Sequence, residues 1–243
     1  MNYSYNKNHG FTLAEVLITL GIIGVVAALT IPTLISKYQE KQTVTKLKKC
    51  YSTLTNAFKQ AEFEYGNIQT WFNSNTSSDN TETVFNNIKP YIKVSKECGF
   101  EPGCMTEGKI KTLDGREYVD YDNSTSEYRF ITSDGTSVMI YSTSPDNCRT
   151  SGLCGNIKVD INGTDGEYTL GKDVFIFNIT DKGIIPSGMK DTTLNQSDFE
   201  RYCDRDGSTN ANGQACAAWV VYNENLDYTK CDDLSWSEKL KCD

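Results

Sequence analysis

A run of apolar residues near the N-terminus constrains this chain more than any other feature. The run extends from Phe11 to Ile31 and contains a single charged residue, Glu15, in 21 residues. At about 1.5 Å of rise per residue, a helix of that length spans about 31 Å, which matches the hydrocarbon thickness of a bilayer. The run therefore predicts a membrane-spanning helix.

The charges on either side of the run predict its orientation. Residues 1–10 are polar and carry Lys7, whereas the whole chain has 24 Lys and Arg against 32 Asp and Glu. The positive-inside tendency places the N-terminus in the cytoplasm and exports the C-terminal part. The net charge of −8 leaves no broad basic face for phosphates. We therefore expect no nucleic acid partner.

The polar-to-apolar switch falls between Gly10 and Phe11, in front of the apolar run. A secretory signal peptide has a shorter apolar stretch that is followed by its cleavage site. Cleavage at the Gly10–Phe11 junction would instead leave the apolar helix on the mature protein. Residues 1–10 are accordingly interpreted as a leader peptide.

The nine residues that begin at Gly10, Gly-Phe-Thr-Leu-Ala-Glu-Val-Leu-Ile, resemble the prepilin cleavage and methylation motif of type IV pilins and type II secretion pseudopilins. The resemblance implies cleavage after Gly10 by a prepilin peptidase and N-methylation of Phe11. It implies that Thr12, Glu15 and Pro32 act in assembly.

The same resemblance implies partners and a location. The partners are other pilin or pseudopilin subunits, an inner-membrane assembly platform and membrane lipid. The chain would cross the bacterial inner membrane once, with its N-terminus in the cytoplasm, and would then enter a filament in the periplasm or at the cell surface.

Glu15 also has an interpretation that rests on energy. A carboxylate in the apolar core costs roughly 2.5–3.5 kcal/mol even on lenient insertion scales, so it needs a partner or a proton. The only cation between Phe11 and Pro32 is the amine that cleavage creates at Phe11, and a neighbouring subunit presents it more easily than the same helix. We expect an intermolecular pair that sets the axial register between subunits. The alternative is a glutamate that reaches towards the headgroups.

Helical periodicity continues beyond the apolar run. Apolar residues recur at alternating steps of four and three on one face, with lysines on the others: Leu47, Tyr51, Leu54, Phe58, Ala61 and Tyr65. We expect one helix over residues 11–65, about 80 Å long, interrupted near Pro32 and ended by Gly66. The stripe is expected to pack on the chain's own soluble domain, with a coiled coil as the alternative.

Residues 66–243 predict an extracytoplasmic domain built on an antiparallel β-sheet. Turns of the Asp-Gly type predict three hairpins, over residues 109–121, 128–141 and 174–185. The polar stretch Asn73–Thr83 predicts a surface loop, and Ala217–Tyr222 predicts a strand that covers the sheet. The expected fold class is α+β and pilin-like, with a long N-terminal helix packed on the sheet.

Nine cysteines in an exported domain predict disulfides rather than reduced thiols. No CxxC pair occurs and the only histidine, His9, lies in the leader, so zinc sites and thioredoxin-like chemistry are not supported. We expect local pairs Cys98–Cys104 and Cys148–Cys154. Four more are expected to pair among themselves with open connectivity: Cys203, Cys216, Cys231 and Cys242. Cys50 is then left over, either buried and free or paired at another cysteine's expense.

An acidic segment offers one candidate metal site. The oxygens of Asp160, Asn162, Asp165 and Asp173 are of the kind that Ca²⁺ prefers. Gly171 stands where an EF-hand has its bidentate glutamate, so the favoured alternative is an Asx-rich turn before a strand. No other cofactor is expected.

The sequence predicts a structural protein and not an enzyme. Cleavage removes the only imidazole, and no glycine-rich phosphate loop is present. We expect a subunit of a type IV pilus-like filament, with the large cysteine-rich domain favouring a minor subunit. One alternative is a pseudopilin of a type II secretion system. The other is a membrane-anchored extracellular binding module or adhesin.

Overall fold

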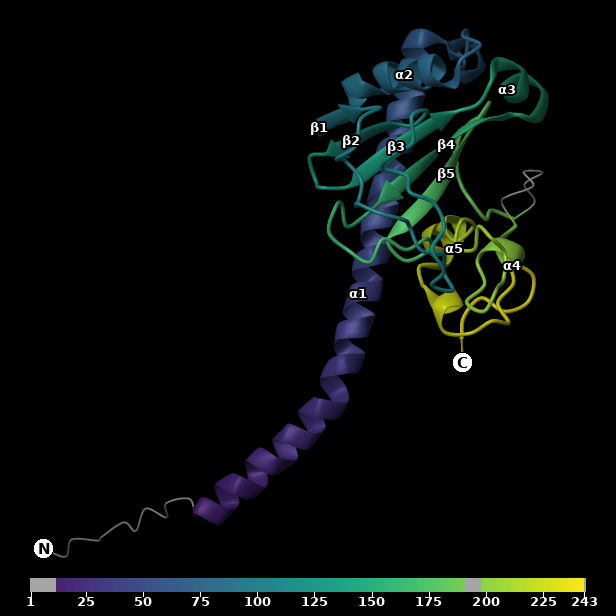
Figure 1. Cartoon of the computed structure of the whole chain (residues 1–243). Coiled ribbons are helices and arrows are strands. Elements are labelled where there is room, and N and C mark those ends of the chain that lie inside the picture. The colour runs from purple at the N-terminus through teal and green to yellow at the C-terminus, as the bar shows by residue number, and fades with distance from the viewer. Residues whose placement is uncertain (1–11, 191–197, 243) are drawn as a thin grey trace, which may run out of the picture. The chain divides into compact units, whose positions relative to one another are not determined.

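The computed structural model describes residues 12–190 and 198–242 (Figure 1). The chain divides into two compact units, Met1–Glu40 and Lys41–Asp243. Helix α1, Leu13–Tyr65, contributes residues to both units. The remaining elements all belong to the second unit.

Helix α1 is continuous over 53 residues, and the expected interruption near Pro32 is wrong. Two hydroxyls beside the proline add bonds to the main chain, from Thr30 Oγ1 to the Val26 carbonyl at 2.9 Å and from Thr33 Oγ1 to the Thr30 carbonyl at 2.8 Å. Such side-chain support is how apolar helices accommodate proline. The helix ends as expected at Gly66, whose φ of +82° is a left-handed conformation that favours glycine.

The second unit contains one six-stranded antiparallel sheet whose strands pair in chain order. Its strands are β1 Val94–Gly99, β2 Tyr128–Thr132, β3 Ser137–Ser142, β4 Leu153–Asp160, β5 Val174–Thr180 and β6 Gly183–Pro186. Short 3₁₀ turns occupy Ile68–Trp71, Lys89–Tyr91 and Asp227–Thr229. The expected α+β class, a long N-terminal helix on an antiparallel sheet, is confirmed.

One face of the sheet packs on the C-terminal half of α1. Leu47, Leu54, Phe58 and Ala61 are at most 1% exposed and share a core with the inward residues of the strands. Tyr51 is half-buried and stacks on Phe177 of β5, with ring centroids 5.3 Å apart. The predicted stripe is therefore confirmed, except that Tyr65 at its end is exposed.

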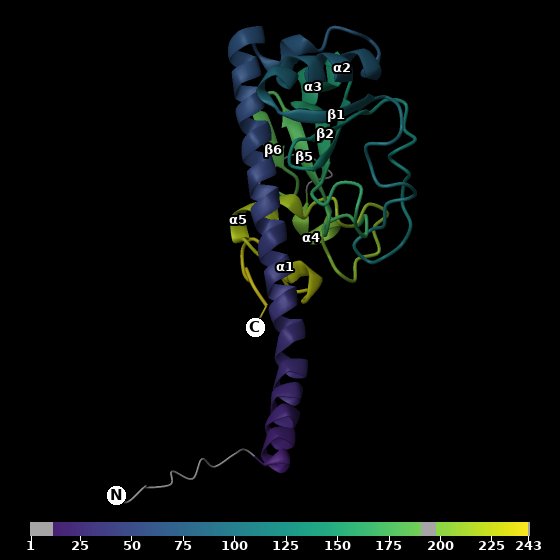
Figure 2. The ribbon, with the colours of Figure 1, turned by 90° about the vertical axis from the view of Figure 1, so that its left-hand side faces the viewer.

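Short helices close the two ends of this layered unit. Figure 2 shows α2, Ser77–Ile88, and α3, Pro145–Ser151, at one end of the sheet. Helices α4, Phe199–Tyr202, and α5, Ala217–Asn223, lie at the other end. Aromatic rings hold the second group together, because Phe199 of α4 stacks on Trp219 of α5 at 4.3 Å.

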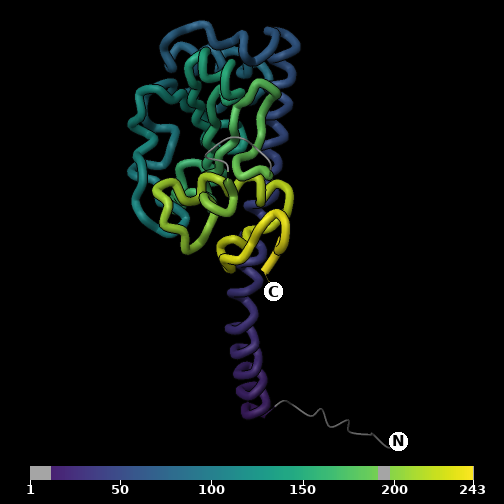
Figure 3. The backbone as a smooth tube through the Cα atoms, turned by 90° about the vertical axis from the view of Figure 1, so that its right-hand side faces the viewer, coloured from purple at the N-terminus to yellow at the C-terminus, as the bar shows by residue number. Residues whose placement is uncertain are grey.

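The other face of the sheet is covered by the long connection between β1 and β2, residues 100–127 (Figure 3). Arg129 on β2 is fully buried and donates hydrogen bonds to four carbonyls of this connection, those of Phe100, Tyr121, Ser124 and Glu127. The guanidinium thus supplies buried donors to a segment that forms no named helix or strand of its own.

A buried ion pair lies beside Arg129 on the same face. Lys158 Nζ is 2.6 Å from Glu127 Oε1, and both side chains are less than a tenth exposed. The Lys158 ammonium also lies over the ring of Tyr121, 4.5 Å from the centroid. Neither charge faces water, so each depends on the other and on the rings around it.

Two of the three predicted hairpins are confirmed, as β2–β3 and β5–β6. In residues 109–121 the turn forms, with Gly115 N bonded to the Thr112 carbonyl at 2.9 Å, and the arms are joined by main-chain hydrogen bonds between Ile110 and Val119 and between Thr112 and Arg116, although neither arm is a named strand. These arms also bond to other loops, for example through Leu113 N to the Asn212 carbonyl.

Two further predictions of local structure are wrong. The expected loop Asn73–Thr83 becomes helical from Ser77, because Val84, Phe85 and Ile88 beyond it bury one side of α2. The expected strand Ala217–Tyr222 is helix α5, whose first five residues are all buried. A short apolar run has no polar face to reveal its period, so helix and strand look alike in sequence.

We predict that Arg129→Met destabilises the second unit by about 3–5 kcal/mol, because it leaves buried carbonyls without donors and the acidic groups around it without their cation. The measurement is a denaturant titration of the full chain in detergent. Arg149→Met, at an exposed arginine on α3, is the matched control and should shift the midpoint little. Equal midpoints for the two variants would contradict the role of Arg129.

Candidate assembly site

The N-terminal half of α1 exposes apolar side chains on every side. Leu13 is 78% exposed, Leu29 72% and Leu34 69%, and the residues between them are similarly open. By length and composition, α1 is the one helix in the described part of the chain that could cross a membrane. An apolar surface of this extent marks a region that another apolar phase or another protein covers.

The start of α1 is organised around Glu15. Its Oε2 accepts hydrogen bonds from Thr12 N and from Thr12 Oγ1, both at 2.8 Å. In return Glu15 N donates to Thr12 Oγ1 at 3.3 Å. This is a capping box, in which a threonine before the helix and a glutamate three residues later satisfy each other's main-chain groups.

The capping box revises one part of the sequence analysis. Glu15 has a partner at the start of its own helix, Thr12, although that partner is uncharged. The spacing Thr-x-x-Glu was a readable signal for it. The cleavage pair, Gly10 and Phe11, lies outside the described residues, and Pro32 lies exposed within α1. The intermolecular pair of Glu15 with a neighbour's amine stays a prediction.

Comparison with protein families assigns the chain. A model described as a family of unknown function (DUF6613) matches residues 33–218, roughly three quarters of the chain. The chain belongs to this family. A second model, the prokaryotic N-terminal methylation motif, matches residues 5–31, which contain the Gly10–Phe11 junction and Glu15. No curated protein and no solved structure matches the chain.

The methylation motif is the prepilin-type signal of type IV pilins and pseudopilins. The chain therefore belongs to the broad class of pilin-like subunits, which includes type IV pilins and pseudopilins. The motif implies processing by a prepilin peptidase and assembly with other pilins. Together with the apolar helix it fits anchoring in the inner membrane before filament entry.

The chain contains four disulfides, and each joins two cysteines that are close in sequence. Cys98 bonds to Cys104 and Cys148 to Cys154, as the sequence analysis expects. The remaining four pair in chain order, as Cys203–Cys216 and Cys231–Cys242. Cys50 is the free cysteine of the described residues and is buried on α1. Burial raises the pKa of the Cys50 thiol to about 12, so at neutral pH it lacks the thiolate needed for disulfide exchange.

Three of the four candidate calcium ligands come together after β4. Asn162 N donates to Asp160 Oδ1 at 3.0 Å, and Asn162 Nδ2 donates to Asp173 Oδ1 at 2.9 Å. Asp165 is exposed and joins none of these bonds. The nearby cation is Lys46 of α1, whose Nζ donates to Asn162 Oδ1 at 3.0 Å. Within the described residues no cluster of three or more His, Cys, Asp and Glu could hold a metal ion.

Calcium binding at this turn stays a prediction. If Ca²⁺ binds the folded turn through Asp160 and Asp173, millimolar CaCl₂ should raise the melting temperature of the full chain in detergent. Asp173→Asn should reduce that rise, and MgCl₂ is the control for ionic strength. An unchanged melting temperature at saturating calcium would contradict the site.

Asp160 generates a prediction about pH. Burial raises the pKa of its carboxyl to about 7, and the charge of Asp173 adds to the rise while the Asn162 amide opposes it. Between the unfolded pKa, 3.8, and about 7 the folded chain binds the additional proton, so this group costs stability as the pH rises. Asp160→Asn should therefore stabilise the chain by on the order of 2 kcal/mol at pH 8 and by little near pH 4.

The measurement is the free energy of unfolding against pH for the wild type and Asp160→Asn. Asp165→Asn, which removes an exposed charge from the same turn, is the matched control and should leave the profile unchanged. A stability gain for Asp160→Asn that is the same at pH 4 and pH 8 would refute the assigned titration.

Proposed function

We propose that the chain is a structural subunit of a type IV pilus-like filament, and a minor one. It is cleaved after Gly10, methylated at Phe11 and polymerised through the N-terminal half of α1. The observation that carries the proposal is the coincidence of the methylation motif with a helix whose apolar side chains are exposed all round. A structural role needs no catalytic residues, and we propose none.

The apolar half of α1 passes between two environments in this scheme. In the inner membrane lipid covers it, with the N-terminus in the cytoplasm and the second unit outside. The assembly platform then transfers the helix into a bundle of copies, where close helix packing replaces lipid contacts. Residues such as Leu13, Leu29 and Leu34 are covered in both states.

Glu15 directs this transfer through its charge. The Thr12 amide and hydroxyl hold one of its carboxylate oxygens at the start of the helix, next to the residue at which cleavage creates an amine. The other oxygen, Oε1, is the one offered to the N-terminal amine of a neighbouring copy. Pairing the two charges inside the bundle offsets the cost of each and selects one axial stagger.

A pseudopilin of a type II secretion system is the second candidate, because pseudopilins carry the same motif. A membrane-anchored binding module or adhesin is the third, and it would keep its leader if the helix served as a plain anchor. Filaments on the cell surface would separate the first candidate from the second.

We predict that Glu15→Gln lowers incorporation of the chain into sheared filaments at least about tenfold, because the amide keeps the shape but not the charge that pairs with the amine. Thr12→Ala, which keeps the amide donor and removes the hydroxyl, should have an intermediate effect. The measurement is the ratio of subunit in the filament fraction to subunit in the membrane fraction.

Two controls make this result specific. Glu40→Gln removes a carboxylate from α1 outside the apolar run and should leave incorporation near the wild-type value. The intact mass of each product reports processing, and the wild type should lack residues 1–10 and carry one methyl group. Normal incorporation of a correctly processed Glu15→Gln chain would overturn the register role. A wild-type chain that retains Met1 and forms no polymer would overturn the proposed function.

A further inference from the structure

Phe63 is the most exposed large apolar residue of the described chain. It lies two residues before the end of α1 and is 95% exposed, more than any residue of the apolar N-terminal half. Its neighbours in sequence are both acidic, Glu62 and Glu64. The ring contributes nothing to the core of its own unit, so its apolar surface is free for a contact outside the chain.

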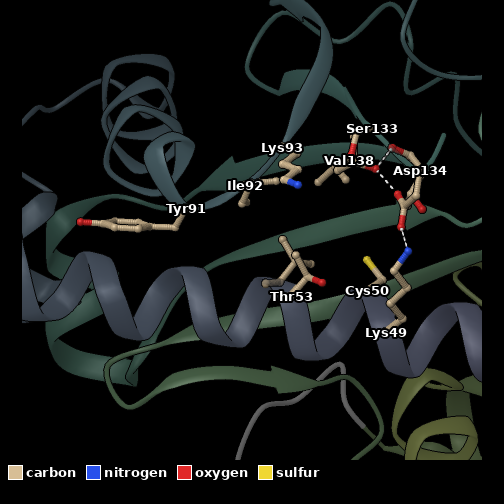
Figure 4. A pocket seen from close by; sticks show the side chains of 12 residues that line it. Lys49, Cys50, Thr53, Tyr91, Ile92, Lys93, Ser133, Asp134 and Val138 are labelled. Atoms are coloured by element: carbon tan, nitrogen blue, oxygen red, sulfur yellow. Dashed lines mark hydrogen bonds and ion pairs between the residues drawn. The ribbon is translucent and has the colours of Figure 1, made fainter.

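A pocket of about 400 Å³ lies on the same unit, between α1, residues 91–93 and the β2–β3 turn. In Figure 4, Cys50 and Thr53 project into it from α1, while Ile92, Lys93 and Val138 face them from the opposite side. Its floor is apolar, because Cys50, Leu54, Ile92 and Val138 are all buried. A cavity of about 150 Å³ with apolar walls already holds a benzene ring, so this pocket has room for one.

The rim of the pocket carries two lysines, Lys49 and Lys93, and one aspartate, Asp134. Lys49 pairs with Asp134 across the opening, with Nζ 2.7 Å from Oδ2 (Figure 4). Lys93, an exposed residue, makes no ion pair among the described residues. Glu64 already accepts a hydrogen bond from the Tyr91 hydroxyl of its own chain, so Glu62 is the carboxylate beside Phe63 that can face Lys93 when the ring enters the pocket.

Phe63 cannot fill the pocket of its own chain. It follows Thr53 by ten residues, which places it about 15 Å farther along a rigid helix. A contact between the two must join different copies, through unlike surfaces of each. If the copies are arranged head to tail and the rotation between them does not close a ring, such a contact repeats from copy to copy along an open polymer.

We infer that Phe63 of one copy inserts into the Lys49–Lys93 pocket of the next copy, with Glu62 facing Lys93. The inference rests on the proposed function, because the apolar helices bring the copies together and the ring adds to that contact. The contact acts at the second unit, offset along α1, and supplements the pairing of Glu15.

The first test compares incorporation into filaments of full-length variants in cells that assemble the wild type. Phe63→Ala, which removes the ring, and Thr53→Trp, which fills the pocket from α1, should each lower incorporation at least about fivefold. Phe63→Trp keeps an aromatic ring and should stay within about twofold of the wild type. Thr150→Trp places the same bulk on α3, away from the pocket, and is the matched control.

The second test locates the ring directly. The photoreactive analogue p-benzoylphenylalanine, placed at position 63, should cross-link assembled copies into a ladder of multimers on illumination. Mass spectrometry should find the partner peptides among residues 49–54, 91–93 and 132–138. The same analogue at position 150 should give no ladder.

The outcomes separate the two proposals. If the wild-type chain is neither processed nor assembled, the proposed function is wrong, and the inference that rests on it is wrong as well. Normal incorporation of both Phe63→Ala and Thr53→Trp in an assembling wild-type background overturns the inference alone. Cross-links from position 63 to a different protein, or to another surface of a copy, also overturn it. A Cys50-containing or Lys93-containing partner peptide from a second copy supports it.

Discussion

The distribution of apolar residues along α1 governs both the fold and the assembly of this protein. In residues 44–61 the apolar side chains occupy one face, and that face packs against the chain's own second unit. In residues 13–35 they occupy every face, and nothing in the described chain covers them. A one-sided stripe is satisfied inside one molecule, whereas an all-round apolar surface requires lipid or further helices. The C-terminal half of α1 therefore contributes to folding, and its N-terminal half provides the surface for assembly.

The features that sequence reasoning predicted are those that local chemistry decides. Asp134-Gly135 forms the predicted turn because Gly135 adopts a φ of +86°, which few other residues tolerate. The pairs Cys98–Cys104 and Cys148–Cys154 each lie six residues apart, so their ends meet whatever the rest of the chain does. Gly66 ends α1 for an equally local reason.

The features that sequence reasoning missed depend on residues far apart in the chain, or on a second role of a residue that already has one interpretation. Nothing near Arg129 in sequence indicates that its guanidinium would organise the connection over residues 100–127, because the acceptors are main-chain carbonyls that any residue supplies. The burial of α5 is likewise decided by Phe199 and the other rings against which it packs. At Glu15 two interpretations apply to one carboxylate, because it caps the start of its own helix through Thr12 and also carries a charge that is costly in lipid.

The placement of the disulfides determines how a subunit responds to pulling. Each of the four closes a short loop, with a separation of 6, 6, 13 or 11 residues, and none includes a residue of α1. Tension that enters through α1 therefore reaches the sheet through the main chain that follows Tyr65, through side-chain packing and through surface pairs such as Lys49–Asp134, which joins α1 to the β2–β3 turn. Separation of the helix from the sheet therefore requires no covalent bond to break, whereas the four disulfides keep their short loops closed.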